Sequence, residues 1–93
     1  MSNRITNAHL QSMCDTINRL TGSPMTYLNE YNQINVGHYH ISGAYGGVNL
    51  ARVVNSSGGE RDVVSCGHIS KRDLYDRMYA YIRGIEYTKK VEA

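Results

Sequence analysis

The stretch 35–50 limits the possible folds most, because it reads as two strands joined by a glycine-rich turn. Side chains alternate in character over residues 34–42, which is typical of a strand, and the pattern changes sense near Gly37, where we expect a bulge or strong twist. The connection 42–47 is rich in glycine, which accepts positive φ. Residues 48–54 form a nearly continuous apolar run, typical of a central strand.

Helices are predicted on both sides of this hairpin. The first covers residues 8–20, with Thr6 or Asn7 as its cap and a stop at Gly22. The second begins after Ser70 and ends near Gly84. Apolar residues repeat every three or four positions, as one buried stripe on each helix requires. The stripes are Leu10, Met13, Cys14, Ile17 and Leu20, then Leu74, Met78, Tyr81, Ile82 and Ile85.

An extended segment over 25–30 and a short strand over 61–66 complete the predicted elements. The predicted fold is therefore α+β, in the order α-β-β-β(-β)-α, with an antiparallel sheet and two helices packed on one face. We expect a single domain over residues 1–93, with an ordered core over about 6–86 and a mobile polar tail over 87–93.

The aromatic residues are unusual, because the chain has 8 Tyr and neither Phe nor Trp. Every large ring thus carries a hydroxyl that needs water or a partner, so we expect several rings at wet surfaces, in a pocket or between subunits of a homo-oligomer. Two cysteines make no disulfide framework, and no stretch resembles a signal peptide or a membrane span. These features predict a cytoplasmic protein that does not contact a membrane.

Metal and catalytic sites are not favoured by the sequence. The metal-like set of His38, His40, Cys66 and His68 matches no zinc spacing, so structural histidines are the better interpretation. Cys66 and His68 would lie about 6–7 Å apart on an extended chain, beyond hydrogen-bonding reach. We therefore predict no enzyme, no metal and no cofactor.

Phosphate binding is better supported. Lys71 and Arg72 lie in the first turn of the second helix, where free N–H groups attract anions and cations are otherwise unfavourable. The hairpin adds glycine N–H groups and tyrosine faces for stacking, although the same glycines can serve turn geometry alone and the helix start can be a plain solvated corner. The candidate ligand-binding residues are His38, Tyr39, His40, Tyr45, Gly46, Gly47, His68, Ser70, Lys71 and Arg72.

Several segments of the chain carry a likeness to a known group: the run 36–47, then Leu50, Asn55, Gly58, Gly59, Asp62 and Val63, and the segments 71–75 and 82–85. Through these residues the chain resembles a group of short, uncharacterised proteins of tailed bacteriophages over about residues 8–87. That group has no established activity, so the resemblance implies no catalytic residue. It implies a phage accessory protein that acts in the host bacterial cytoplasm, where such proteins counter host defence by seizing a nucleotide signal or covering a defence protein.

Three hypotheses of function follow. The first is a non-enzymatic protein that binds a nucleotide-like ligand or signal through the residues above. The second is a module that blocks a host protein through Tyr75 and Tyr79, which lie four residues apart, or through a sheet edge. The third is a nucleic-acid-binding domain, because double-stranded RNA-binding domains share the predicted order and present basic residues at the start of their second helix.

Overall fold

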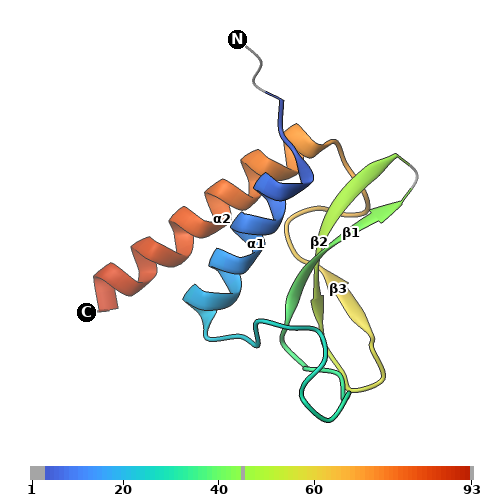
Figure 1. Ribbon diagram of the computed structural model, residues 1–93. Helices are drawn as coiled ribbons and strands as arrows, with labels where there is room; N and C mark the ends of the chain where they lie inside the picture. The colour runs from blue at the N-terminus through green and yellow to red at the C-terminus, as the bar shows by residue number, and fades with distance from the viewer. Residues whose placement is uncertain (1–3, 45, 93) are drawn as a thin grey trace.

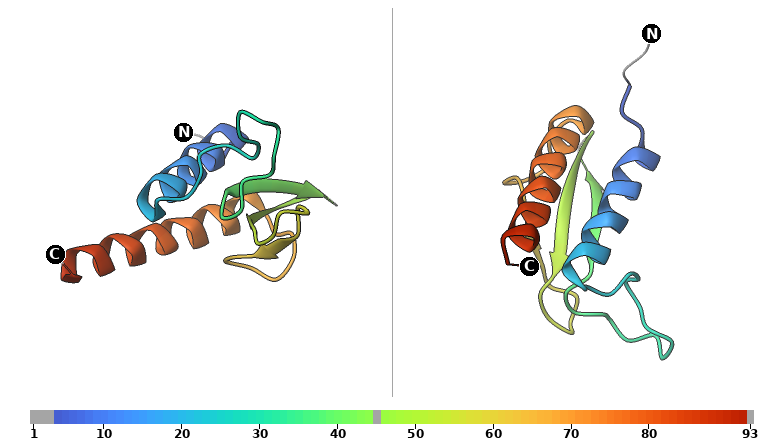
Figure 2. Two further views of the ribbon diagram at one scale, coloured as in Figure 1. Left: turned by 90° about the horizontal axis from the view of Figure 1, so that it is seen from below. Right: turned by 90° about the vertical axis from the view of Figure 1, so that its left-hand side faces the viewer.

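The computed structural model describes residues 4–44 and 46–92. Their elements confirm the predicted α+β order α-β-β-β-α (Figure 1). Strand β2 is central in a three-stranded antiparallel sheet of order β1-β2-β3. The two helices cover one face of this sheet (Figure 2). The elements are α1 (Asn7–Thr21), β1 (Tyr39–Ala44), β2 (Gly47–Val53), β3 (Glu60–Asp62) and α2 (Lys71–Glu92).

Helix α1 begins and ends at local sequence signals. The Thr6 side chain accepts a hydrogen bond from the backbone N–H of His9, and the His9 ring accepts one from the backbone N–H of Thr6. This reciprocal pair is a capping box in which His9 replaces the usual Glu or Gln. Gly22 ends the helix in the left-handed conformation at φ 68°, and Pro24 follows.

Helix α2 is longer than predicted. It begins at Lys71, where the Ser70 hydroxyl accepts from the Asp73 N–H at 3.1 Å. The expected end near Gly84 is wrong, because the helix runs to Glu92 and includes most of the predicted polar tail. Glycine inside a helix costs only about 1 kcal/mol relative to alanine. Lys89 and Lys90 in the last turn offset part of that cost, because cations are favourable at the negative end of the helix dipole.

Strand β1 is shorter than predicted, because it begins at Tyr39 instead of residue 34. Gly37 has φ 99° and bends the chain just before the strand, at the position where the sequence pattern changes sense. Before this bend, Ile34 forms an isolated bridge with Leu28 and makes no part of the sheet. The side-chain alternation of residues 34–36 therefore belongs to a loop with local pairing.

Strand β3 is also shorter than predicted. It covers Glu60–Asp62, whereas the sequence predicted a strand over residues 61–66. The Asp62 carboxylate accepts hydrogen bonds from the Gly67 N–H at 3.0 Å and from the Asn49 amide at 2.6 Å. These two hydrogen bonds, the first above all, lower the pKa of the Asp62 carboxyl. They also fold residues 63–67 into a turn, which ends the strand.

The core lies between the two helices and the sheet. Cys14 is buried, as predicted from its place in the first stripe. The central cluster of the core is Leu10, Cys14, Ile17, Tyr39, Val48, Leu50, Leu74 and Met78.

Neither helix in residues 4–44 and 46–92 has the length and apolar character needed to cross a membrane.

Candidate functional site

The end of the β1–β2 hairpin lies directly beside the start of α2. Val48 and Ile69 form an antiparallel bridge, with hydrogen bonds of 2.7 Å from the Val48 N–H and 2.8 Å from the Ile69 N–H. This bridge fixes the chain two residues before Lys71, so α2 begins next to the first residues of β2 (Figure 1). The two regions that the sequence singled out for anion binding are therefore adjacent.

A groove of about 500 Å³ lies between these regions and the start of α1, and we call it the hairpin groove. It brings together the first residue of each helix, Asn7 of α1 and Lys71 of α2. The first N–H groups of a helix have no intrahelical acceptor and carry a partial positive charge. The groove is lined by Asn7, Gln11, Ile41, Gly43, Ala44, Gly46, Gly47, Val48 and Lys71.

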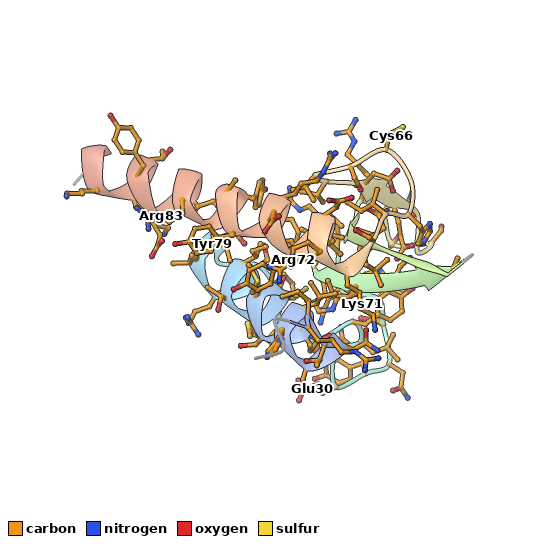
Figure 3. All side chains as sticks on the ribbon, turned by 90° about the horizontal axis from the view of Figure 1, so that it is seen from above. Glu30, Cys66, Lys71, Arg72, Tyr79 and Arg83 are labelled. Carbon is orange, nitrogen blue, oxygen red and sulfur yellow. The ribbon has the colours of Figure 1, made fainter. Side chains whose placement is uncertain are left out.

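A second groove, of about 550 Å³, is lined by other residues of the first turns of α1 and α2. Arg72 lines it and lies next to Lys71 in the first turn of α2 (Figure 3). The Arg72 guanidinium lies 5.8 Å from the centre of the Tyr75 ring and 4.0 Å from the Asp76 carboxylate. We call this the N-terminal groove; its lining residues are Arg4, Ile5, His9, Ser12, Met13, Arg72 and Tyr75.

Gly47 packs closely against the 68–69 segment at the end of the hairpin. The Ser42 hydroxyl and the His68 Nε2 lie 2.9 Å apart, within hydrogen-bonding distance. A Cβ atom on Gly47 would lie 3.1 Å from both the His68 Cβ and the Ile69 carbonyl oxygen. Gly47 therefore lets the 68–69 segment cross close to β2, in addition to lining the groove.

Tyr39, one of the predicted ligand-binding residues, does not line the hairpin groove. Its side chain is buried under the helices, where its hydroxyl lies 3.1 Å from the Tyr81 hydroxyl. The Arg52 guanidinium lies 5.2 Å from the centre of the Tyr39 ring. The sequence pattern showed that Tyr39 faces the opposite side from His38 and His40, but it did not show that Tyr39 contacts Tyr81 of α2.

His38 and His40, which the sequence also assigned to ligand binding, do not line the hairpin groove either. Their rings stack at 6.0 Å and 7°, as expected for two side chains on one face of a strand. The His38 Nδ1 lies 2.8 Å from the Pro24 carbonyl oxygen, and the His40 Nε2 is paired with the Glu60 carboxylate. His38 therefore attaches the segment at Pro24 to the sheet, whereas His40 links β1 to β3.

The other residues that the sequence assigned to ligand or partner binding lie in different places. Ser70 caps α2, and Tyr45 lies outside the described residues. Tyr75 lines the N-terminal groove, whereas Tyr79 is 51% exposed and its hydroxyl accepts a hydrogen bond from Arg83 at 3.3 Å (Figure 3).

Groups suited to metal binding or nucleophilic attack are dispersed. Within residues 4–44 and 46–92, no three His, Cys, Asp or Glu side chains gather as a metal site would require. Both cysteines are free, and Cys66 is exposed on the turn before α2 (Figure 3). Burial, with a smaller effect of Asp15, raises the pKa of the Cys14 thiol to about 12, so this thiol is inert at neutral pH.

Asn7 and Gln11 are groove residues that the sequence did not single out. Both lie on α1 one turn apart, which is a readable signal of a shared polar face. Their position opposite Lys71 depends on the packing of α1 beside α2, which no local pattern specifies.

Comparisons with protein families, with curated proteins and with solved structures find no match for this chain.

Proposed function

We propose that this chain is a non-enzymatic binding protein whose hairpin groove takes the phosphate group of a small nucleotide-like ligand. One observation carries the proposal. Lys71 lines the same groove as the glycines of the hairpin end, Gly43, Gly46 and Gly47. An ammonium group and closely approachable backbone are the elements of a phosphate site.

The two helix starts support a phosphate at this place. The first N–H groups of each helix have no acceptor within the helix and carry a partial positive charge, and the first residue of each helix lines the groove. Lys71 at the start of α2 is unfavourable for the helix dipole, and a bound anion removes that conflict.

The rest of the groove suits the non-phosphate part of a nucleotide. Ile41, Ala44 and Val48 supply an apolar floor, and the amides of Asn7 and Gln11 both donate and accept hydrogen bonds. The volume of about 500 Å³ falls within the range of small-molecule sites.

Binding is favoured over catalysis by the residues that line the groove. Among the described residues, Lys71 is its only titratable side chain, so no carboxylate, imidazole or thiol is in place for proton transfer or attack. Because the sequence resembles phage proteins, we propose further that the ligand is a signal of host defence and that this chain sequesters it in the bacterial cytoplasm.

The test is thermal unfolding with a panel of cyclic and linear nucleotides and inorganic phosphate. A ligand at a hundredfold excess over its dissociation constant is expected to stabilise the chain by about 2.7 kcal/mol. Lys71→Gln should weaken binding about tenfold, since one charge-assisted hydrogen bond contributes about 1.5 kcal/mol or more. Lys90→Gln, in the last turn of α2, is the matched control and should bind as the original chain does. Equal binding by both variants would refute the proposed site.

Nucleic acid is the second candidate, because Lys71 and Arg72 are neighbours at the start of α2 and line two different grooves. Arg4 and Arg72 in the second groove extend the cationic surface from Lys71 across both helix starts. The α-β-β-β-α order is also that of double-stranded RNA-binding domains. Duplex binding would weaken steeply with salt, and Arg72→Gln would reduce the salt slope by about 1. Salt-independent binding, or no binding to duplexes, eliminates this candidate.

A further inference from the structure

Most of the exposed large apolar side chains of the described residues lie on one loop, residues 25–36, which we call the apolar loop. Tyr31 at its tip is 75% exposed, and Leu28 is 43% exposed. Contiguous exposed apolar residues on a small protein usually mark a contact surface. The other members are Met25, Tyr27 and Val36.

The apolar loop is held in one shape by its own hydrogen bonds. The Asn29 Oδ1 accepts from the Tyr31 N–H at 2.8 Å and from the Gln33 N–H at 3.0 Å. The Asn35 N–H donates to the Tyr27 carbonyl oxygen at 2.9 Å, beside the Leu28–Ile34 bridge. A rigid loop loses little conformational entropy when a partner binds, so the exposed side chains are preorganised.

The base of the loop is attached to the sheet. The His38 ring holds the Pro24 carbonyl at 2.8 Å, and the Tyr27 ring lies edge-on to His38 and His40, with centroid distances of 6.3 Å and 5.8 Å. The apolar loop therefore projects from the sheet as part of the same rigid unit.

A third groove, of about 750 Å³, lies at the end of α1 and along the second half of α2. It exists because α2 continues past the end of α1 at Thr21, so α1 does not cover this part of α2 (Figure 2). Leu20, Tyr81 and Ile85 give it an apolar wall. We call it the C-terminal groove; its other lining residues are Thr21, Ala80, Gly84, Thr88 and Lys89.

We propose that the apolar loop of one copy of this chain fits the C-terminal groove of a second copy, and that the contact is reciprocal. The charges are complementary: Glu30, beside Tyr31, is the only charged residue in positions 23–37, and Lys89 is the only charged residue among those described as lining the groove. Tyr31 is the apolar anchor, and Glu30 pairs with Lys89 at the rim.

The positions of the two surfaces allow a closed dimer. Ser23, where the chain leaves α1 toward the loop, directly follows the last turn of α1, and that turn supplies Leu20 and Thr21 to the groove. A two-fold axis near the end of α1 would therefore bring each loop to the groove of the other copy. A chain of 93 residues buries little surface alone, which makes added burial in a dimer favourable.

Sedimentation velocity of the full chain over a concentration series tests the dimer. The original chain is expected to dimerise, and Tyr31→Ser should raise the dimer dissociation constant about tenfold or more, as the loss of a buried aromatic anchor does. Tyr87→Ser, which is 70% exposed on α2 and lies outside the groove lining, is the matched control and should leave the constant unchanged. A monomer at every concentration, or a dimer equally stable with Tyr31→Ser, overturns the proposal.

Charge reversal tests the proposed pairing itself. Glu30→Lys and Lys89→Glu should each weaken the dimer, and the double variant should restore it. Glu30→Lys with Lys90→Glu should not restore it, because Lys90 is not among the groove residues. Circular dichroism confirms that each variant is folded. Failure of the Glu30→Lys, Lys89→Glu double variant to recover dimerisation would also overturn the proposal, whatever the outcome for nucleotide binding.

Discussion

The side-chain amide of Asn18 gives Tyr39 both hydrogen bonds that a neighbouring strand would supply. The Asn18 Oδ1 accepts from the Tyr39 N–H at 2.8 Å, and the Asn18 Nδ2 donates to the Tyr39 carbonyl at 3.0 Å. Both residues are buried, and the Cys14 thiol donates to the same carbonyl at 3.2 Å. Helix α1 thus closes part of the free edge of β1, which positions the helix beside the hairpin groove.

Asn18→Ala should destabilise the chain by about 2–3 kcal/mol, because the Tyr39 N–H loses its partner and its carbonyl keeps only the weak thiol donor. Urea unfolding measures the change. Arg19→Ala, the exposed neighbour on the same helix, is the control and should stay within about 0.5 kcal/mol. Equal effects of the two substitutions would show that the Asn18 amide is not a structural substitute for a strand.

Tyr81 should make stability fall at alkaline pH. Burial, and then the hydrogen bond with Tyr39, raise the pKa of the Tyr81 hydroxyl from 10.0 to about 12. The folded chain therefore holds this proton more tightly than the unfolded chain, so its contribution to stability is complete below pH 10 and is lost as the pH rises toward 12. Tyr81→Phe should show a smaller alkaline loss in urea unfolding than Tyr87→Phe. Identical pH profiles would contradict the hydrogen-bonded, half-buried position of Tyr81.

The two cysteines should differ in reactivity. Burial raises the pKa of Cys14 to about 12, whereas Cys66 is exposed. At neutral pH iodoacetamide should modify Cys66 in the folded chain and leave Cys14 intact, and in denaturant it should modify both. Peptide mass spectrometry identifies the modified residue, and Cys66→Ser should abolish the reaction of the folded chain. Modification of Cys14 at a comparable rate without denaturant would contradict its burial.

Two glycine-to-alanine substitutions should act in opposite directions. Gly47→Ala places a Cβ 3.1 Å from His68 and from the Ile69 carbonyl, so it should destabilise the chain by about 1–3 kcal/mol through overpacking. Gly84→Ala meets nothing within 4 Å inside a helix and should stabilise it by about 0.5–1 kcal/mol. Urea unfolding of both variants gives the sign of each change in the free energy of unfolding. A stabilising Gly47→Ala would refute the close crossing at the hairpin.

Local signals made the order of elements readable from the sequence. The three-and-four spacing of Leu10, Cys14 and Ile17 marks α1, and Gly22 ends it. The end of α2 was not readable, because a glycine inside a helix and one past its end look alike until packing is known. The predicted start of β1 at residue 34 was wrong for a similar reason, since residues 34–36 alternate in character but Ile34 pairs only with Leu28 in the local loop.

The candidate site was predictable only in part. The glycine turn and the Lys71 helix start each have a local signature, and the structure places them beside one groove. His38 and Tyr39 were assigned to the same site from their closeness in sequence, but successive residues of an extended chain face opposite sides. Their true partners, Pro24 and Tyr81, are 14 and 42 residues away, a pairing that tertiary packing alone determines.

The central claim is that a phosphate-bearing ligand occupies the hairpin groove, and amide chemical-shift mapping tests it most directly. The ¹⁵N-labelled chain is titrated with the nucleotide that gives the largest thermal stabilisation, and with inorganic phosphate. We expect saturable shifts at the backbone amides of Gly43, Gly47 and Lys71 and at the side-chain amides of Asn7 and Gln11, and loss of these shifts in Lys71→Gln. Saturable shifts confined to the apolar loop or the C-terminal groove, or no saturable shift with any nucleotide, would contradict the claim.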